Sequence, residues 1–281
     1  MIRILTDSAA DLEPQEFSSL GLELVPLSIT VDKRIYQADL RFNKQDFFRM
    51  LEASPIFPTT SQPAPADFET IFEDARQKGD DLVFVSLSSA LSGTFQCASV
   101  VKAMGGYDNV YLVDSLSATL GQKQLVVQAA ALRDRGFPAA EIAARLEALK
   151  GRIRIYAGLD TLEYLQKGGR LSKAAAGLGT LARIKPVVTV TPQGTVAVAG
   201  KCLGKAKAMS QIVSLVEKAP PDPRFPIYGV YSGSRDNFLE LQQKLRKAGT
   251  DIPDELGFCI GPVIGAHIGP GAYGVVYIAK A

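Results

Sequence analysis

Short apolar runs alternate with helix-like stretches from Met1 to Lys150, and this alternation restricts the fold more than any other feature of the sequence. Met1–Leu5, Leu82–Val85 and Val110–Val113 have the length and composition of buried strands, and each is followed by a polar turn and a helix-like stretch. Strands that are separated by helices pair in parallel, and the helices then cover both faces of the sheet. The sequence therefore predicts a parallel-sheet α/β/α fold for this half of the chain.

The segment from Leu82 to Ala98 joins a predicted strand to a predicted helix through a loop rich in hydroxyl groups. After Leu82–Val85 the chain passes through Ser88 and Ser92, and helix-like sequence resumes at Phe95. Loops at the carboxyl ends of parallel strands often hold ligands, because the following helix N-terminus offers unpaired N–H groups to an anion. A serine in such a loop equally serves to cap the helix. Both interpretations stay open for these serines.

Two predicted strands end in the same polar pair. Asp7-Ser8 follows the first strand, and Asp114-Ser115 follows the strand Val110–Val113. Carboxyl ends of parallel strands lie along one edge of a sheet, so we expect both pairs at the edge where ligands bind. Asp and Ser are also frequent helix caps, which is the alternative interpretation of this repeat.

The pattern changes near Lys150, and the rest of the chain is typical of an α+β domain. Pro186–Thr191 and Thr195–Ala199 flank a Pro-Gln-Gly turn, which predicts a β-hairpin. The last segment, from Phe258 to Ala279, is expected to form a strand, a glycine-rich loop and a final strand. We therefore predict two domains, an N-terminal α/β domain at 1–151 and a C-terminal α+β domain at 152–281.

Composition excludes several classes of function. The net charge is +2 with the basic residues scattered, which gives no indication of a nucleic-acid partner. Three distant cysteines and no signal-like N-terminus favour a cytoplasmic location, and no apolar run is long enough for membrane insertion. His267 is the only histidine, so no multi-histidine metal site is expected and we predict no metal ligands. Residues 269–274 spell G-x-G-x-x-G, but no helix follows and no P-loop is present, so no nucleotide cofactor is predicted.

Two further side chains carry alternative interpretations. His267 can in principle act as a base for Ser92, with Asp7 or Asp114 orienting it, although the residues around Ser92 lack the first glycine of a nucleophile elbow. That arrangement would make the protein a hydrolase or acyl-transfer enzyme. Arg170 follows two glycines and either reaches an anion or lies on the solvated surface.

Seven short motifs, taken in order, resemble the DegV family of bacterial fatty-acid-binding proteins. The resemblance extends from Thr6 to Gly274, which is nearly the whole chain. Each motif alone is weak, and their combination is specific. They are Thr6-Asp7-Ser8 with Asp11-Leu12, Pro58-Thr59-Thr60-Ser61-Gln62-Pro63, Leu91-Ser92-Gly93-Thr94, Val113-Asp114-Ser115, Leu162-Glu163-Tyr164-Leu165 with Gly168-Gly169-Arg170-Leu171-Ser172, Ile184-Lys185-Pro186, and Gly265-Ala266-His267-Ile268-Gly269-Pro270-Gly271.

The resemblance implies a two-domain carrier that holds a long-chain fatty acid, such as palmitate, stearate or oleate, in a tunnel between its domains. Family positions that bind the carboxylate correspond to Thr60 and Ser92. The positions of Arg170 and His267 are implicated in work with an ATP-dependent fatty-acid kinase, a separate protein that phosphorylates the bound acid. The carrier itself is then not an enzyme. One departure is Leu203, which stands where members commonly carry arginine, and it affects only the expected partner contacts.

The head-group motifs contain hydroxyls but no lysine or arginine. A carboxylate held without a cation has a raised pKa, so we expect the bound acid to be partly neutral. Three functions remain: a fatty-acid carrier, which the motifs favour; an enzyme with Ser92 as nucleophile; and a transcriptional or interaction module that senses lipid. The near-neutral charge argues against the third.

Overall fold

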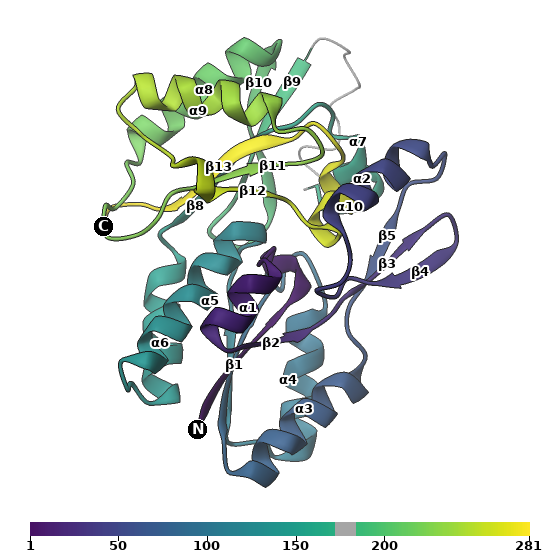
Figure 1. The fold of residues 1–281 in the computed structure, drawn as a ribbon, viewed down its shortest axis with the longest axis vertical. Coiled ribbons are helices and arrows are strands. Elements are labelled where there is room, and N and C mark those ends of the chain that lie inside the picture. The colour runs from purple at the N-terminus through teal and green to yellow at the C-terminus, as the bar shows by residue number, and fades with distance from the viewer. Residues whose placement is uncertain (172–183) are drawn as a thin grey trace.

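The computed structural model describes residues 1–171 and 184–281 and has the mixed α/β architecture that the sequence predicts (Figure 1). One parallel sheet is built from strands of the first half of the chain. A second, mixed sheet is built from strands of the second half. In Figure 1 the parallel sheet lies in the lower part of the molecule and the mixed sheet in the upper part.

The parallel sheet has the strand order β2-β1-β6-β7. Helices α3 and α4 cover one face, and α1, α5 and α6 lie against the other. The central strand β6 is buried on both faces, which explains why its sequence is a continuous apolar run rather than an alternating one. The elements of this layer are β1 (Ile2–Asp7), a short 3₁₀ turn (Ser8–Ala10), α1 (Pro14–Leu20), β2 (Leu22–Val25), α3 (Pro65–Lys78), β6 (Asp81–Ser86), α4 (Thr94–Gly105), β7 (Val110–Asp114), α5 (Thr119–Asp134) and α6 (Ala139–Lys150).

A small antiparallel sheet of order β4-β3-β5 projects from this layer. The stretch Leu22–Val31 predicts one strand with Pro26 at an edge or a bulge, but Pro26 separates β2 from β3, and the two strands belong to different sheets. Residues 54–65 contain four prolines, which predicts a shaped loop, but the stretch contains β5, whose Thr60 pairs with Ile29 of β3. This sheet and its neighbouring helix comprise β3 (Ser28–Val31), β4 (Arg34–Gln37), α2 (Lys44–Ala53) and β5 (Thr59–Ser61).

The second sheet has the order β10-β9-β8-β13-β11-β12, with α8 and α9 packed on its outer face. Strands β9 and β10 form the predicted hairpin. The elements of this half are β8 (Ile153–Gly158), α7 (Glu163–Lys167), β9 (Ile184–Val190), β10 (Val196–Leu203), α8 (Lys205–Lys218), β11 (Tyr228–Tyr231), α9 (Asp236–Lys247), a 3₁₀ turn (Asp254–Leu256), β12 (Gly257–Cys259), α10 (Pro262–Ile268) and β13 (Tyr273–Ile278).

The prediction of a glycine-rich loop between the last two strands is wrong in its first half, because residues 262–268 form helix α10. Pro262 occupies the first helical position, which proline tolerates well. Gly265 is a poor helix former, but it allows α10 to pack tightly, since a Cβ there would lie 2.8 Å from a ring carbon of Phe47. Tertiary packing thus stabilises a helix that local propensity does not favour, and it places His267 on a rigid element.

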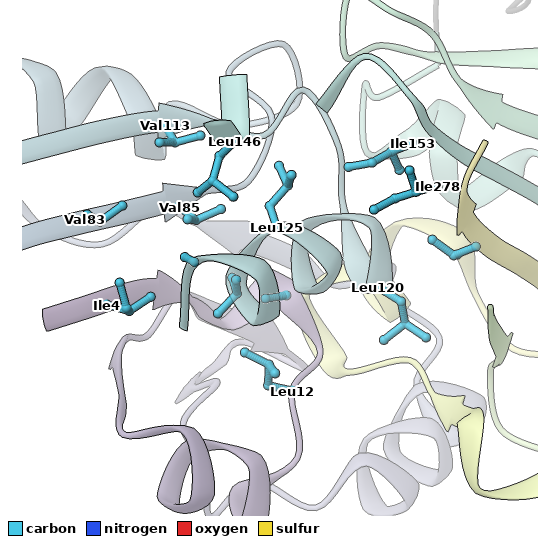
Figure 2. Packing of buried hydrophobic residues seen from close by; sticks show 14 of the residues in the cluster. Ile4, Leu12, Val83, Val85, Val113, Leu120, Leu125, Leu146, Ile153 and Ile278 are labelled. Carbon is cyan, nitrogen blue, oxygen red and sulfur yellow. The ribbon is translucent and has the colours of Figure 1, made fainter. Parts of the chain in front are cut away.

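Helix α5 lies between the two sheets and links them. Figure 2 shows Leu125 of this helix between Val85 of the parallel sheet and Ile278 of the mixed sheet, within one continuous apolar cluster. Lys123 of the same helix is fully buried and pairs with Glu16 at 2.6 Å, so its charge is compensated. The two halves therefore share a core, and the domain boundary at 151/152 stays a prediction.

No helix within 1–171 or 184–281 is both long and apolar enough to cross a bilayer.

Candidate functional site

The four candidate residues line one cavity, although they are far apart in the sequence. Thr60 comes from β5, Ser92 from the loop before α4, Arg170 from the segment after α7, and His267 from α10. The cavity measures about 60 Å³. Apart from these four, the described residues that line it are apolar and come from both halves of the chain: Leu27, Leu87, Leu91, Ala118, Leu165, Val196, Val263, Ile264 and Ile268.

Thr60 and His267 are hydrogen-bonded, with 2.8 Å between Oγ1 and Nε2. Burial lowers the pKa of His267 to about 4, and the nearby Arg170 charge acts in the same direction. The imidazole is therefore neutral at pH 7. Its Nδ1 is buried and has no hydrogen-bond partner among the described residues. A buried unpaired N–H is rarer than a buried unpaired lone pair, so we assign the proton to Nε2. Nε2 then donates to Thr60, and the Thr60 hydroxyl keeps its own proton for another acceptor.

Gly168 forms the wall behind His267. A Cβ on this glycine would lie 2.3 Å from Nδ1 of His267 and 3.0 Å from the carbonyl oxygen of Tyr164. The backbone angle φ of Gly168 is −73°, which any residue adopts, so the constraint is steric. Gly168, the first glycine of the Gly168-Gly169-Arg170 motif, thus allows the imidazole of His267 to lie against the main chain.

Ser92 both supports the helix start and lines the cavity. Its Oγ accepts a hydrogen bond from the Thr94 main-chain N–H at 3.3 Å and lies 2.9 Å from the Thr94 hydroxyl. Gly93, and not Ser92, is the N-cap of α4, so Ser92 supports the helix start from the preceding position while it lines the cavity. Ser88 has a different role: its hydroxyl donates to the Gly194 carbonyl at 2.9 Å and connects the loop to the β9–β10 hairpin.

Arg170 is half-buried and fixed by main-chain oxygens. Its Nε donates to the Leu91 carbonyl at 3.0 Å, and its Nη1 donates to the Gly168 carbonyl at 2.6 Å. The surface interpretation of Arg170 is therefore wrong. A cation lies beside the two hydroxyls, which removes the basis for expecting a raised carboxylate pKa at this site.

The carboxylates at the ends of β1 and β7 lie along the same sheet edge, as their repeat predicts, but they bind the main chain. Asp7 accepts hydrogen bonds from the Ala9 and Leu87 N–H groups, at 3.0 and 2.7 Å. Asp114 accepts from Ser89 at 3.1 Å and from Leu116 at 3.0 Å. Both acids therefore hold the loops around the site.

The contacts of a hydrolase triad do not form among the described residues. No hydrogen bond joins Ser92 to His267 there, and no carboxylate contacts Nδ1 of His267 in that part of the chain. The described residues also contain no group of three or more His, Cys, Asp or Glu side chains that could hold a metal ion. Leu203, the departure from the family pattern, is exposed at the end of β10.

Sequence reasoning missed two contributors to the site. Thr94 and Gly168 both lie within the motifs, but the motifs alone predict no role for either. The spacing Ser92-Gly93-Thr94 at a helix start was the available signal for the first. No local signal could identify the second, because its contact with His267 joins segments 99 residues apart in a chain of 281 residues.

The chain matches known proteins along its whole length. The sequence model of the DegV family, which is described as a family of uncharacterised proteins, matches residues 1–280. A DegV domain-containing protein of Listeria monocytogenes is 32% identical over 285 residues, and the alignment covers 99% of both chains.

Two solved structures have a similar fold and substantial identity. A DegV family protein from Thermus thermophilus, described by its fatty-acid binding, has a TM-score of 0.88 at 33% identity, with 99% of both chains covered. DegV from Bacillus subtilis, described as a fatty-acid-binding protein, has a TM-score of 0.82 at 28% identity and the same coverage. This chain therefore belongs to the DegV family.

Proposed function

We propose that this protein binds a long-chain fatty acid, such as palmitate, stearate or oleate, with its carboxylate at Thr60 and Ser92. One observation carries the proposal: two hydroxyls from distant segments meet beside Arg170 in a cavity whose other described lining residues, His267 apart, are apolar. Such a site matches a ligand with one anionic end and a long hydrocarbon chain. The fatty-acid binding described for the proteins of Thermus thermophilus and Bacillus subtilis supports the same conclusion.

The acyl chain provides most of the binding free energy in this proposal. Burial of about a dozen methylenes is worth on the order of 10 kcal/mol before ordering costs. The cavity of about 60 Å³ is smaller than a long acyl chain requires, so the apolar side chains around it must move apart on binding. Since these side chains come from both halves of the protein, the packing between the halves around the cavity adjusts when lipid enters.

We further propose that the protein presents the bound carboxylate to a separate ATP-dependent fatty-acid kinase, and that it catalyses no reaction itself. The guanidinium of Arg170 lies beside the two hydroxyls, where it can stabilise the charge of an acyl phosphate, and His267 donates its one N–H to Thr60 and so orients that hydroxyl. The three free cysteines are consistent with a cytoplasmic carrier.

Native mass spectrometry tests the binding proposal directly. The purified protein should carry an additional mass that denaturing extraction identifies as a fatty acid of 14 to 18 carbons. The double variant Thr60→Val/Ser92→Ala should purify with much less of it. An empty protein that also fails to take up added palmitate or oleate would overturn the proposal, and acyl-ester turnover that Ser92→Ala abolishes would favour the enzyme alternative.

Kinase presentation needs its own assay. Purified kinase, ATP and palmitate are incubated with the carrier, and acyl phosphate is trapped with hydroxylamine as the hydroxamate. We expect product only when the carrier is present, and less with Arg170→Ala or His267→Ala. Equal product with and without the carrier would contradict presentation.

A further inference from the structure

Thr94 has a buried hydroxyl whose one hydrogen-bond partner among the described residues is Ser92. The residue is fully buried at the first position of α4, and its Oγ1 lies 2.9 Å from the Ser92 Oγ. The distance alone permits either hydroxyl to be the donor. The surroundings of the two groups decide between these directions.

If Ser92 were the donor, the Thr94 proton would be left in the protein interior without an acceptor in the part of the chain that the structure describes. An unpaired buried donor is strongly unfavourable. If Thr94 is the donor, its proton is paired, and the Ser92 proton points to the cavity, where a ligand or water can accept it. The second direction leaves no buried group unsatisfied.

Ser92 then has no acceptor capacity left. A hydroxyl oxygen accepts two hydrogen bonds, and Ser92 already receives one from the Thr94 main-chain N–H and one from its hydroxyl. Its remaining capacity is to donate one proton. Thr60, which receives a hydrogen bond from His267, likewise retains a proton to donate.

We infer that Thr94 is a positioning residue that makes Ser92 an obligate donor, so that the site selects ionised acyl head groups over neutral ones. The inference rests on the proposed fatty-acid function and specifies its ligand. A carboxylate has two oxygens, carries no proton and accepts from both hydroxyls. A protonated acid, a primary amide or an alcohol brings a proton that Ser92 cannot accept, so only the one free lone pair of Thr60 is left for it.

The test compares ligands that share one chain and differ only in head group. Affinities for palmitate, hexadecanamide and hexadecanol are measured for the wild type, Thr94→Val and Thr94→Ser at pH 8. We expect the wild type to bind palmitate at least about tenfold more tightly than either neutral ligand, from the cost of one unpaired group. Thr94→Val should reduce this ratio severalfold, and Thr94→Ser should restore it.

Ser99→Ala is the matched control, because the Ser99 hydroxyl lies on the same helix and donates to the Phe95 carbonyl at 2.8 Å. It should leave the ratio unchanged. If Thr94→Val weakens all three ligands equally, Thr94 is only structural and the inference is wrong. An unchanged ratio also overturns it.

A measurement on the wild type does not depend on the variants folding. Carboxyl-labelled palmitate is titrated in the complex and followed by carbon-13 NMR. We expect the bound carboxyl pKa to lie below the value in free solution, and a higher value would overturn the inference. Failure of the wild type to bind any palmitate would instead refute the proposed function, and the inference with it.

Discussion

Two sets of polar side chains lie around the site: the carboxylates Asp7 and Asp114, and the hydroxyls Thr60 and Ser92. The carboxylates accept hydrogen bonds from main-chain N–H groups of the loops around the sheet edge. The hydroxyls instead contact the side chains of His267 and Thr94 and face the cavity. A carboxylate that bonds loop N–H groups maintains the scaffold, whereas a hydroxyl that keeps a proton in an apolar cavity is available to a ligand, even where, as at Ser92, it also accepts from a main-chain N–H.

The comparison explains why residue type alone does not identify this site. Asp7 is fully buried, and burial raises its pKa to about 6, although its hydrogen bonds to main-chain N–H groups act in the opposite direction. It is therefore mostly ionised at pH 7. As a charged group at the ligand edge of a parallel sheet, it has the features of an active-site residue, yet its hydrogen bonds are to the loop.

The largest effect is expected for the scaffold. Asp7→Ala leaves the buried N–H groups of Ala9 and Leu87 without their acceptor, at about 1–3 kcal/mol each. We expect the free energy of unfolding to fall by about 4 kcal/mol in urea denaturation. Asp108→Ala, at an exposed position, is the control and should change it by less than about 0.5 kcal/mol. A stable Asp7→Ala protein that has lost its ligand would place Asp7 in the site instead.

A smaller effect is expected from the titration of His267. Its folded-state pKa of about 4 lies below the usual 6.5, so the native state binds fewer protons than the unfolded state between these values. Its contribution to stability is complete above pH 6.5 and is lost as the pH falls to 4, by about 3 kcal/mol at most. Burial raises the pKa of Asp7 and Asp11 to about 6, and their protonation acts in the opposite direction over the same range, so the loss is measured as the difference in unfolding free energy between the wild type and a variant without this imidazole.

His267→Gln provides the comparison for this pH dependence. Glutamine does not titrate, so the variant should lose less stability than the wild type between pH 6.5 and 4. Parallel curves for the two proteins would show that His267 is charged in the fold at neutral pH or is not buried in solution. Either result would remove the argument for its role as a donor to Thr60.

The hydroxyls should affect binding more than stability. Loss of one donor to a carboxylate costs about 1.5–3 kcal/mol, which is roughly tenfold to a hundredfold in affinity. We expect Ser92→Ala and Thr60→Val to weaken palmitate binding by this amount, as measured by calorimetry. Thr70→Val removes an exposed hydroxyl on α3 that bonds the Ala66 carbonyl, and it should bind normally. Unchanged binding in both site variants would separate the hydroxyls from the head group.

The same contrast shows what the sequence can predict. The strands of the parallel sheet can be predicted from the sequence, because burial on both faces produces continuous apolar runs, as in β6. Strand β5 cannot be predicted from the sequence, because it has three residues and follows a proline-rich turn. Helix α10 cannot be predicted from the sequence either. A glycine at position 265 weakens the helical pattern, and only the close packing against Phe47 and Phe48 explains its presence in the helix.

The candidate site residues were predicted from the order of motifs and not from their spacing. No periodicity relates Thr60 to His267, which are hydrogen-bonded across 207 residues of sequence. The direction of that hydrogen bond depends on the absence of a partner for Nδ1 among the described residues, which only coordinates can reveal. Motif resemblance thus predicts four residues that line one cavity, and the structure is needed to distinguish donors from acceptors among them.

The smallest expected effect separates two neighbouring glycines. Gly168→Ala puts a methyl group against His267, which should move the imidazole away from Thr60 and weaken palmitate binding by about threefold to tenfold, or roughly 1 kcal/mol. Gly169 has a positive φ of 70° and open space at its Cβ. Gly169→Ala should therefore lower the free energy of unfolding by about 1 kcal/mol and leave affinity unchanged. If both variants affect only stability, His267 does not position Thr60, and the contrast between ligand-facing and scaffold groups applies to Ser92 alone.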